Sequence, residues 1–302
     1  MKKKRSHTTR RGITERPPLG QHFLTSTKVL ADIVRAAEIR PGELILEIGP
    51  GKGVLTRALL AAGARVIAIE RDKTLAAELT NEFSENTSMT LIVGDAIEIL
   101  EQGTIMQLRN EPYAVVANIP YAITGRLFRL LWSHPTLPAP TRTVALVQKE
   151  VADRMMARIG AGTGMNLLGL ATHCYGTPKY ISTVPKGAFQ PPPNVMSAIT
   201  AVTKHGFNPL TDAGIISADD FFGIARTAFQ QKRKQLHTSL KKYWPDEGSS
   251  GAKKIEMYQM RRPETLSLDD WMNLYQGLQK TWKNIGDYAQ NKCVITSIRL
   301  LY

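Results

Sequence analysis

Short apolar runs alternate with segments of helical periodicity between residues 25 and 150, and this alternation limits the fold more than any other feature of the chain. The runs contain hardly any polar residue, which is typical of strands buried on both faces. They lie at residues 44–48, 66–69, 91–93, 114–117 and 144–147. The helical segments between them begin near residues 29, 54 and 75. We therefore expect an α/β fold with a doubly wound parallel sheet whose two faces are covered by helices.

A glycine-rich segment, Glu47-Ile-Gly-Pro-Gly-Lys-Gly53, follows the first run and opens a helical segment. Without a Cβ atom at Gly49 and Gly51, a ligand can approach the backbone closely at the start of the helix. Glu70 ends the next run, where a carboxylate can accept hydrogen bonds from both hydroxyls of a ribose. The pattern fits NAD and S-adenosylmethionine equally, and a tight turn with a surface acid would also explain it. A Walker-type phosphate loop is excluded, since no Gly-Lys-Ser/Thr follows at the required spacing.

Two further polar positions follow the third and fourth runs. Asp95 lies where a carboxylate can accept a hydrogen bond from an adenine amino group, although Asp is also a common turn residue. Asn118-Ile-Pro-Tyr121 closes the fourth run. The strand ends of a doubly wound sheet gather along one edge, where ligands bind. We therefore expect Asp95 and Asn118 to lie beside the glycine-rich segment.

The segment Asn118-Ile-Pro-Tyr121 suits one particular reaction. The exocyclic amine of adenine is a poor nucleophile because its lone pair is delocalised into the ring. The side-chain carbonyl of Asn118 and the backbone carbonyl of Pro120 would each accept one N–H, which pulls the nitrogen toward tetrahedral geometry. The proline ring fixes φ and holds its carbonyl in place. Tyr121 offers a face for stacking of the base, worth about 1–3 kcal/mol. A strand-ending turn with a core tyrosine is the alternative.

The cysteines disfavour other chemistry. Methylation of cytosine at C5 needs a cysteine nucleophile, whereas Cys174 follows an apolar helical stretch where small buried thiols are common. Cys174 and Cys293 are the only cysteines of the chain, too few for a disulfide framework or a cysteine-based zinc cluster. We expect no metal site.

The pattern changes near residue 205, beyond which there is little strand signal. Apolar residues recur at helical spacing after two candidate capping boxes, in which Asp takes the place of Glu. The boxes are Ser217–Asp220 and Ser267–Asp270. We predict a smaller all-helical domain over residues 209–282, with residues 248–251 as a loop inside it. Residues 283–302 show no clear pattern.

The basic surplus of the chain is confined to two segments. The net charge is +13, but residues 17–220 and 263–302 each carry equal numbers of acids and bases. Residues 1–16 hold seven basic side chains and one acid, and residues 221–262 hold ten and three. Such segments indicate a polyanionic partner. The first segment fits a nucleic-acid-binding arm and a solubilising disordered arm equally well.

Five bases follow Phe229 with no acid between them, and we expect them within one helical stretch. They are Lys232, Arg233, Lys234, Lys241 and Lys242. We interpret them as contacts to RNA phosphates, which position a substrate and make binding salt-sensitive. A solvated helix face is the alternative. No run approaches the length of a membrane span and no apolar stretch follows the N-terminal lysines, so we expect a cytoplasmic protein without a membrane partner.

Taken together, the motifs resemble those of the small-subunit ribosomal RNA adenine dimethyltransferase family, in the same order and spacing over about residues 17–280. They are Leu19-Gly-Gln-His-Phe-Leu24, the glycine-rich segment, Glu70, Gly94-Asp-Ala96, Asn118-Ile-Pro-Tyr121, Gln148-Lys-Glu-Val-Ala-Asp-Arg154, Phe189-Gln-Pro-Pro-Pro-Asn-Val195, Phe229-Gln-Gln-Lys-Arg-Lys234 and Leu266-Ser-Leu268. The resemblance implies a Rossmann-like methyltransferase domain over residues 17–208 and a helical RNA-binding domain over residues 209–282. It implies transfer of methyl groups from S-adenosylmethionine to N6 of two adjacent adenosines. These lie in a hairpin near the 3′ end of 16S rRNA in the 30S subunit, and the enzyme is expected to be a monomer.

The same resemblance assigns individual residues. It implies that His22 and Leu24 contact the cofactor, alongside Gly49, Gly51, Glu70, Asp95 and Asn118. It further implies that Phe189 stacks on the target base opposite Tyr121, although a packed loop aromatic would look the same in sequence. The chain departs from the family pattern at His22, where members often have Asn, and at Asn194, where a Lys is frequent. Histidine can still donate a hydrogen bond, whereas Asn194 would weaken one phosphate contact.

Three other functions are alternatives to this one. A 23S rRNA adenine N6-methyltransferase of the macrolide-resistance type shares the motifs, but its C-terminal domain is usually shorter. A non-catalytic ribosome-assembly or transcription factor could share the fold. A nicotinamide-dependent reductase has no use for Asn118-Ile-Pro-Tyr121.

Overall fold

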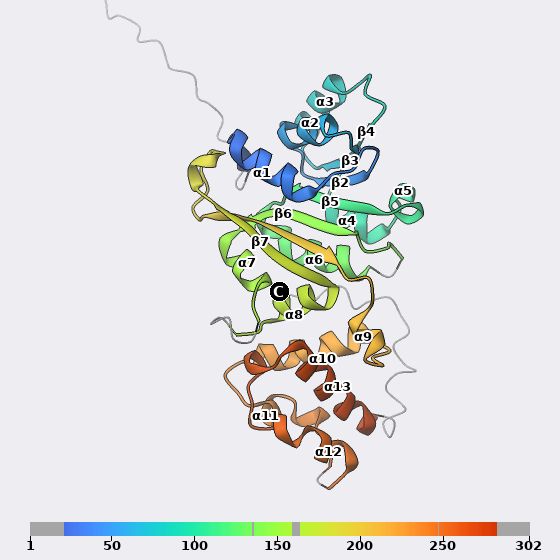
Figure 1. Ribbon diagram of the computed structural model, residues 1–302, viewed down its shortest axis with the longest axis vertical. Coiled ribbons are helices and arrows are strands. Elements are labelled where there is room, and N and C mark those ends of the chain that lie inside the picture. Colours follow the sequence, from blue (N-terminus) through green and yellow to red (C-terminus); the bar gives the residue numbers. More distant parts are fainter. Residues whose placement is uncertain (1–20, 135, 159–163, 247, 283–302) are drawn as a thin grey trace, which may run out of the picture.

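The computed structural model describes residues 21–134, 136–158, 164–246 and 248–282. The basic segment at residues 1–16 and the tail at residues 283–302 lie outside the described residues. Over the described part, a seven-stranded sheet lies beside a group of helices formed by the C-terminal third of the chain (Figure 1).

The five predicted strands are confirmed and run parallel to one another. They are β2 (Leu44–Ile48), β3 (Arg65–Glu70), β4 (Met89–Val93), β5 (Tyr113–Asn118) and β6 (Arg142–Gln148). Their order within the sheet is β4-β3-β2-β5-β6. The direction of winding therefore reverses between β2 and β5, which is the position where open α/β sheets bind ligands.

The sheet is not wholly parallel, and in this respect the prediction was wrong. Two further strands, β9 (Ser197–Lys204) and β7 (Gly176–Val184), extend it beyond β6 in antiparallel orientation. β7 is an edge strand whose residues are largely half-buried or exposed and which contains Pro178, so it lacks the continuous apolar pattern of the parallel strands. A separate two-stranded sheet pairs β1 (Phe23–Leu24) with β8 (Phe189–Gln190).

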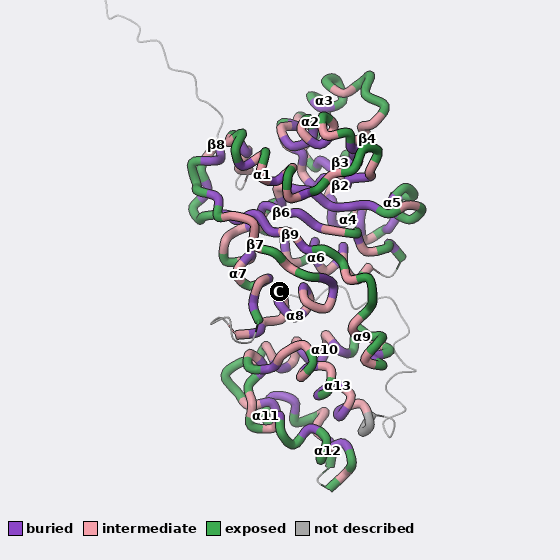
Figure 2. The backbone as a smooth tube through the Cα atoms, viewed as in Figure 1, coloured by how far each residue is buried: buried purple, intermediate pink, exposed green. Residues whose placement is uncertain are grey.

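Helices cover both faces of the sheet, as expected. Side chains of β2 alternate between two cores, so that Leu46 packs into one core and Ile45 into the other. The core on the side of Ile45 contains α1 (Thr27–Ala37) and α2 (Val54–Ala61). The opposite core contains α4 (Ala96–Gln102), α5 (Met106–Asn110), α6 (Thr124–Ser133), α7 (Lys149–Met155) and α8 (Leu167–Tyr175). Figure 2 shows the central strands buried along most of their length.

Two local signals set the helices that flank the site. Ser26 caps α1, since its side chain accepts a hydrogen bond from the Val29 N–H. Asp72 caps α3 (Lys73–Glu82) in the same way, since its side chain accepts from the N–H groups of Thr74 and Leu75. None of the helices in the described residues is long and apolar enough to cross a membrane.

From Pro209 onward the described chain is helical. Its helices are α9 (Pro209–Asp212), α10 (Ala218–Gln230), α11 (Leu236–Ser239), α12 (Ser250–Ile255) and α13 (Leu268–Trp282). They enclose a third core around Phe221, Trp271 and Tyr275, which also takes in Leu170 of α8. In Figure 1 these helices lie at the end of the molecule beyond α8.

The capping predictions in this region hold, whereas the loop prediction fails in part. Ser267 Oγ accepts from the Asp270 N–H, and an Asp270 carboxylate oxygen accepts from the Ser267 N–H, which completes a reciprocal capping box. Ser217 accepts from Asp220 in one direction. Residues 248–251 do not form one loop, because Ser249 caps α12 by accepting from Ala252 N.

Candidate active site

A pocket of about 140 Å³ opens where β2 and β5 end, at the reversal point of the sheet. Segments far apart in the sequence line it. The lining residues are Gln21, His22, Phe23, Leu24, Glu47, Gly49, Pro50, Gly51, Lys52, Val54, Leu55, Glu70, Leu75, Asn118, Ile119, Pro120 and Tyr121. Most of the residues singled out from the sequence are therefore brought together here.

The glycine-rich segment needs its glycines for two reasons. Gly49, Gly51 and Gly53 have φ values of 67°, 57° and 72°, in the left-handed region that other residues rarely adopt. A Cβ atom at Gly51 would also lie 3.2 Å from the ring of Phe23. A Cβ at Gly53 would lie 2.8 Å from Leu79 Cδ2. The backbone of this segment therefore borders the pocket without side chains at its glycines, so a ligand can approach it closely.

Glu70 holds the two turns that border the pocket. It is 6% exposed, its Oε2 accepts from Gly51 N at 2.9 Å, and its Oε1 accepts from Asp72 N at 2.8 Å. An ionised carboxylate has about four acceptor positions, so both oxygens keep capacity for a ligand hydroxyl. The carboxylate and the bare glycine backbone together fit the adenosine part of S-adenosylmethionine.

Glu47 is a buried carboxyl of the pocket to which the sequence assigned no role. It is 1% exposed and accepts a hydrogen bond from Thr56 Oγ1 at 2.7 Å. Burial raises the pKa of its carboxyl to about 8, the Thr56 hydrogen bond lowers it, and the charge of Glu70 raises it further. The signal in the sequence was an acid inside an otherwise apolar run.

Asn118 lines the pocket, and its side-chain nitrogen is already hydrogen-bonded. Its Nδ2 donates to the backbone carbonyl of His22 at 3.4 Å. Because a carbonyl oxygen can only accept, the amide group of Asn118 is oriented with its nitrogen toward His22. Its Oδ1 is then left to accept from a ligand in the pocket that Asn118 lines.

The Pro120 carbonyl, which we expected to receive the adenine amine, already has two hydrogen-bond donors within the protein. Pro120 has φ −56°, as a proline must, but its carbonyl already accepts from Ile123 N at 3.2 Å and from Thr124 Oγ1 at 3.3 Å. Both of its lone pairs are therefore in use. No described residue donates to the neighbouring carbonyl of Ile119. The Ile119 side chain is buried in the core although the residue lines the pocket, so its backbone borders the cavity.

Tyr121 lines the pocket and is fixed both at its backbone and at its hydroxyl. Its backbone follows Pro120, and its Oη lies 2.6 Å from Ser197 Oγ. Its ring centroid is 6.0 Å from that of His22 at an interplanar angle of 32°. Burial raises the pKa of the Tyr121 phenol above its ordinary value, so the side chain is neutral at physiological pH.

His22 ties the start of the described chain to the segment after β8. Its Nδ1 lies 2.9 Å from the carbonyl of Pro191, to which it can only donate. Thr25 adds two bonds to the carbonyl of Ala188, from its N–H at 2.9 Å and its Oγ1 at 3.1 Å. Leu24 is buried opposite Phe189 in the β1–β8 pair and also lines the pocket.

Phe189 does not present a ring face in this structure. It is 3% exposed and packs in the core that also contains Leu24 and Ala188. Stacking on a target base would require that ring to be uncovered. In this structure the contacts of Phe189 fit the alternative interpretation, an aromatic side chain packed within the core.

Asp95 serves as a helix cap. Its Oδ1 accepts from Ile97 N at 2.9 Å, at the start of α4, and its Oδ2 lies 3.6 Å from Arg71 Nη1. It is not among the residues that line the pocket. The turn-residue interpretation thus accounts for its contacts in this structure.

The five predicted phosphate contacts are exposed but do not lie on one helix. α10 ends at Gln230, and Lys232, Arg233 and Lys234 occupy the turn before α11. Lys241 and Lys242 belong to a short 3₁₀ turn after it, where Lys242 Nζ lies 4.5 Å from the centroid of the Tyr243 ring. The prediction of one helical stretch was therefore wrong, because a turn at residues 231–234 separates α10 from α11.

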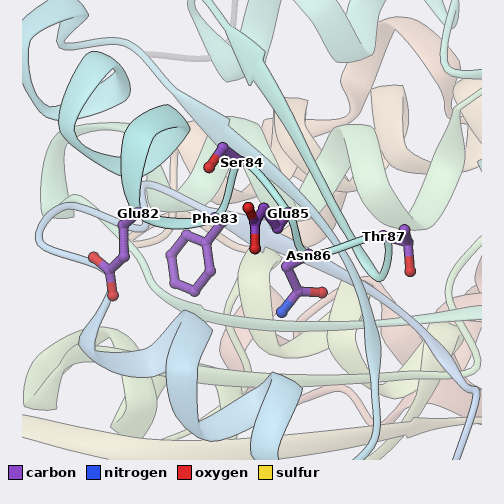
Figure 3. A pocket seen from close by; sticks show the side chains of 6 residues that line it. All are labelled: Glu82, Phe83, Ser84, Glu85, Asn86 and Thr87. Carbon is purple, nitrogen blue, oxygen red and sulfur yellow. The ribbon is translucent and has the colours of Figure 1, made fainter.

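Two other features carry no comparable chemistry. A hollow of about 470 Å³ is lined by residues 82–87. Figure 3 shows their side chains spread along the end of α3 and the loop that leads to β4. Cys174 lies in α8, where burial raises the pKa of its thiol to about 12 and keeps it protonated at neutral pH. In the described ranges no group of three or more His, Cys, Asp or Glu side chains could hold a metal ion.

Solved structures share this fold. A dimethyladenosine transferase from Plasmodium falciparum has a TM-score of 0.69 and 24% identity, over 88% of this chain and 98% of that one. The 23S rRNA methyltransferase ErmE has a TM-score of 0.63 and 23% identity, over 85% of this chain and 99% of that one. At these identities the likeness concerns the fold, a methyltransferase sheet with a helical C-terminal part.

Closer relatives are found by sequence. A ribosomal RNA small subunit methyltransferase A from Dehalococcoides mccartyi is 38% identical over 289 residues, 93% of this chain and 91% of its own length. A protein of the same name from Thermosynechococcus vestitus is 37% identical over 279 residues, 90% of this chain and 100% of its own length. Residues 12–280 match the family described as ribosomal RNA adenine dimethylase. With the pocket, the glycine-rich segment and the Asn118 turn in place, the chain belongs to the ribosomal RNA adenine dimethylase family.

Proposed function

We propose that this protein transfers methyl groups from S-adenosylmethionine to N6 of two adjacent adenosines in a hairpin near the 3′ end of 16S rRNA, in the 30S subunit, to give N6,N6-dimethyladenosine. The observation that carries the proposal is the orientation of Asn118. Its amide nitrogen is bonded to the His22 carbonyl, which leaves its oxygen to accept from a ligand in the pocket that Asn118 lines together with Glu70 and the glycine-rich segment.

S-adenosylmethionine supplies an electrophilic methyl group when bound. Glu70 would accept the ribose hydroxyls, while Gly49 and Gly51 let the ligand lie directly against the backbone. His22 and Leu24 also line the pocket. We propose these as the cofactor-binding residues, with Asn118 at the boundary between cofactor and target base.

The turn after β5 would orient and activate the amine. Asn118 Oδ1 accepts one N–H of the adenine amine, and the carbonyl of Ile119 accepts the other in place of the Pro120 carbonyl. The two bonds pull the nitrogen toward tetrahedral geometry and direct its lone pair at the methyl group. Positioning supplies most of the rate, because the donor is already a strong electrophile. The product ammonium is acidic enough to lose its proton to water.

Tyr121 would provide the stacking face for the target base. Stacking on an aromatic side chain is worth about 1–3 kcal/mol per base. A base that enters the pocket must be unpaired and turned out of its stack, which suits an adenosine in a hairpin loop.

Exposed cations of the helical part would hold the RNA backbone. Lys232, Arg233, Lys234, Lys241 and Lys242 lie on turns at the start and end of α11, so they can follow an irregular phosphate path. Such contacts position the RNA without reading its sequence. We further propose that the protein acts as a monomer in the cytoplasm.

Labelled S-adenosylmethionine, incubated with the protein and with undermethylated ribosomal subunits, tests the proposal. Label in adenosines of 16S rRNA is the expected result. Label in 23S rRNA alone would assign the protein to the other methyltransferase type, which has the same fold. No label in any RNA, with the cofactor still bound, would indicate an assembly factor.

A further inference from the structure

One hydrogen bond joins the catalytic turn to the strand that follows β8. Tyr121 Oη lies 2.6 Å from Ser197 Oγ, although the two residues are 76 positions apart in the sequence. Tyr121 lies just after β5, and Ser197 is the first residue of β9. The bond therefore links the turn of the Asn118 motif to a strand that begins two residues after the Phe189–Val195 motif.

Ser197 occupies a rigid position. Its backbone pairs with Gln148 of β6 on one side and with Val184 of β7 on the other, and it is 0% exposed. The carbonyl of Met196 just before it accepts from Lys149 N at 2.9 Å. A buried hydroxyl needs a hydrogen-bond partner, and Tyr121 supplies it.

Tyr121, in contrast, is only half-buried and lines the pocket. Its ring would be free to turn about its side-chain torsions if nothing held the hydroxyl, since staggered alternatives are usually accessible. Pro120 fixes the backbone end of the residue, and Ser197 fixes the far end of the ring. The orientation of the stacking face thus depends on the buried serine.

We propose that Ser197 is a positioning residue for adenine methylation: its hydroxyl anchors Tyr121 Oη and holds the ring where the target base stacks beside Asn118. This inference rests on the proposed function of the pocket. A site held in its productive geometry by a supporting hydrogen bond loses rate when that bond is removed, because small misplacements of the reacting atoms are costly.

The test compares Ser197→Ala, Tyr121→Phe and the double variant in single-turnover methylation of undermethylated 30S subunits at saturating cofactor. Each single variant should slow methyl transfer about tenfold, which corresponds to about 1.4 kcal/mol and suits the loss of one buried hydrogen bond. The double variant should be no slower than either single one, because both remove the same bond. Cofactor affinity should stay unchanged.

Thr200→Val is the matched control. Thr200 is another hydroxyl residue of β9 with 0% exposure, but it donates to the Ala145 carbonyl at 3.3 Å and not to Tyr121. The single-turnover methylation rate of Thr200→Val should stay within about twofold of the wild-type rate.

Three results would overturn the inference. They are a wild-type rate in Ser197→Ala, multiplying losses in the double variant, and an equal loss in Thr200→Val. A wild-type protein that methylates no adenosine would instead refute the proposed function, and this inference with it.

Discussion

The buried carboxyl of Glu47 gives a stability prediction whose size can be worked out. Burial raises its pKa to about 8 in the folded protein, against 4.5 for an ordinary glutamate. Between these two pH values the unfolded chain has released the proton while the folded chain still holds it. The free energy of unfolding therefore falls as pH rises through this window, and levels off above pH 8. At 1.36 kcal/mol per pKa unit, the total loss is on the order of 5 kcal/mol.

Glu47→Gln isolates this effect. Glutamine keeps an oxygen for the hydrogen bond from Thr56 Oγ1 but has no proton to release. Urea unfolding between pH 5 and 9 should show that the wild type loses stability relative to Glu47→Gln as pH rises. Glu85→Gln, at an exposed carboxylate, is the control and should follow the wild type. Parallel curves for wild type and Glu47→Gln would refute the argument that Glu47 is buried with a raised pKa.

Two further outcomes follow from the site and the basic turns. Gly51→Ala should weaken cofactor binding at least tenfold, as measured by calorimetry. Alanine is strained at φ 57°, and its Cβ would lie 3.2 Å from the Phe23 ring. An unchanged affinity would contradict the close approach of the ligand to the backbone. Replacing Lys232, Arg233 and Lys234 by Ala should weaken RNA binding and lower the slope of log affinity against log salt by about 2, measured by filter binding. The same methylated positions should remain, and a change of target base would contradict a role confined to phosphates.

The apolar runs in the sequence predicted the parallel part of the sheet. All five apolar runs became parallel strands. In β2, β3, β5 and β6 burial on both faces leaves little room for polar residues, and that constraint is local to each run, whereas β4 is a partly exposed edge strand. β7 was not predicted because it lies at an edge, half in contact with solvent. β9 is mostly buried, but Ser197, Thr200 and Thr203 interrupt its apolar residues. Only the tertiary pairing of β9 with β6 creates that edge.

The site was predictable in its members but not in its details. Residues at strand ends meet because the sheet is parallel, so the glycine-rich segment, Glu70 and Asn118 converge as expected. The use of the Pro120 carbonyl by Ile123 and Thr124 depends on the 3₁₀ turn that follows, which no motif specifies. The burial of Phe189 likewise depends on the pairing of β1 with β8.

The central claim is that Asn118 activates the adenine amine for N6 methylation. The most direct test is to identify the nucleosides that the wild-type protein and Asn118→Ala produce. Undermethylated 30S subunits are incubated with each protein and S-adenosylmethionine, and the digested rRNA is analysed by mass spectrometry. Binding of RNA and cofactor to each protein is measured in parallel. We predict N6,N6-dimethyladenosine at two adjacent positions of 16S rRNA for the wild type, and none for Asn118→Ala despite retained RNA binding. Dimethyladenosine formed by Asn118→Ala at the wild-type rate, or a methylated base other than adenine, would contradict the account.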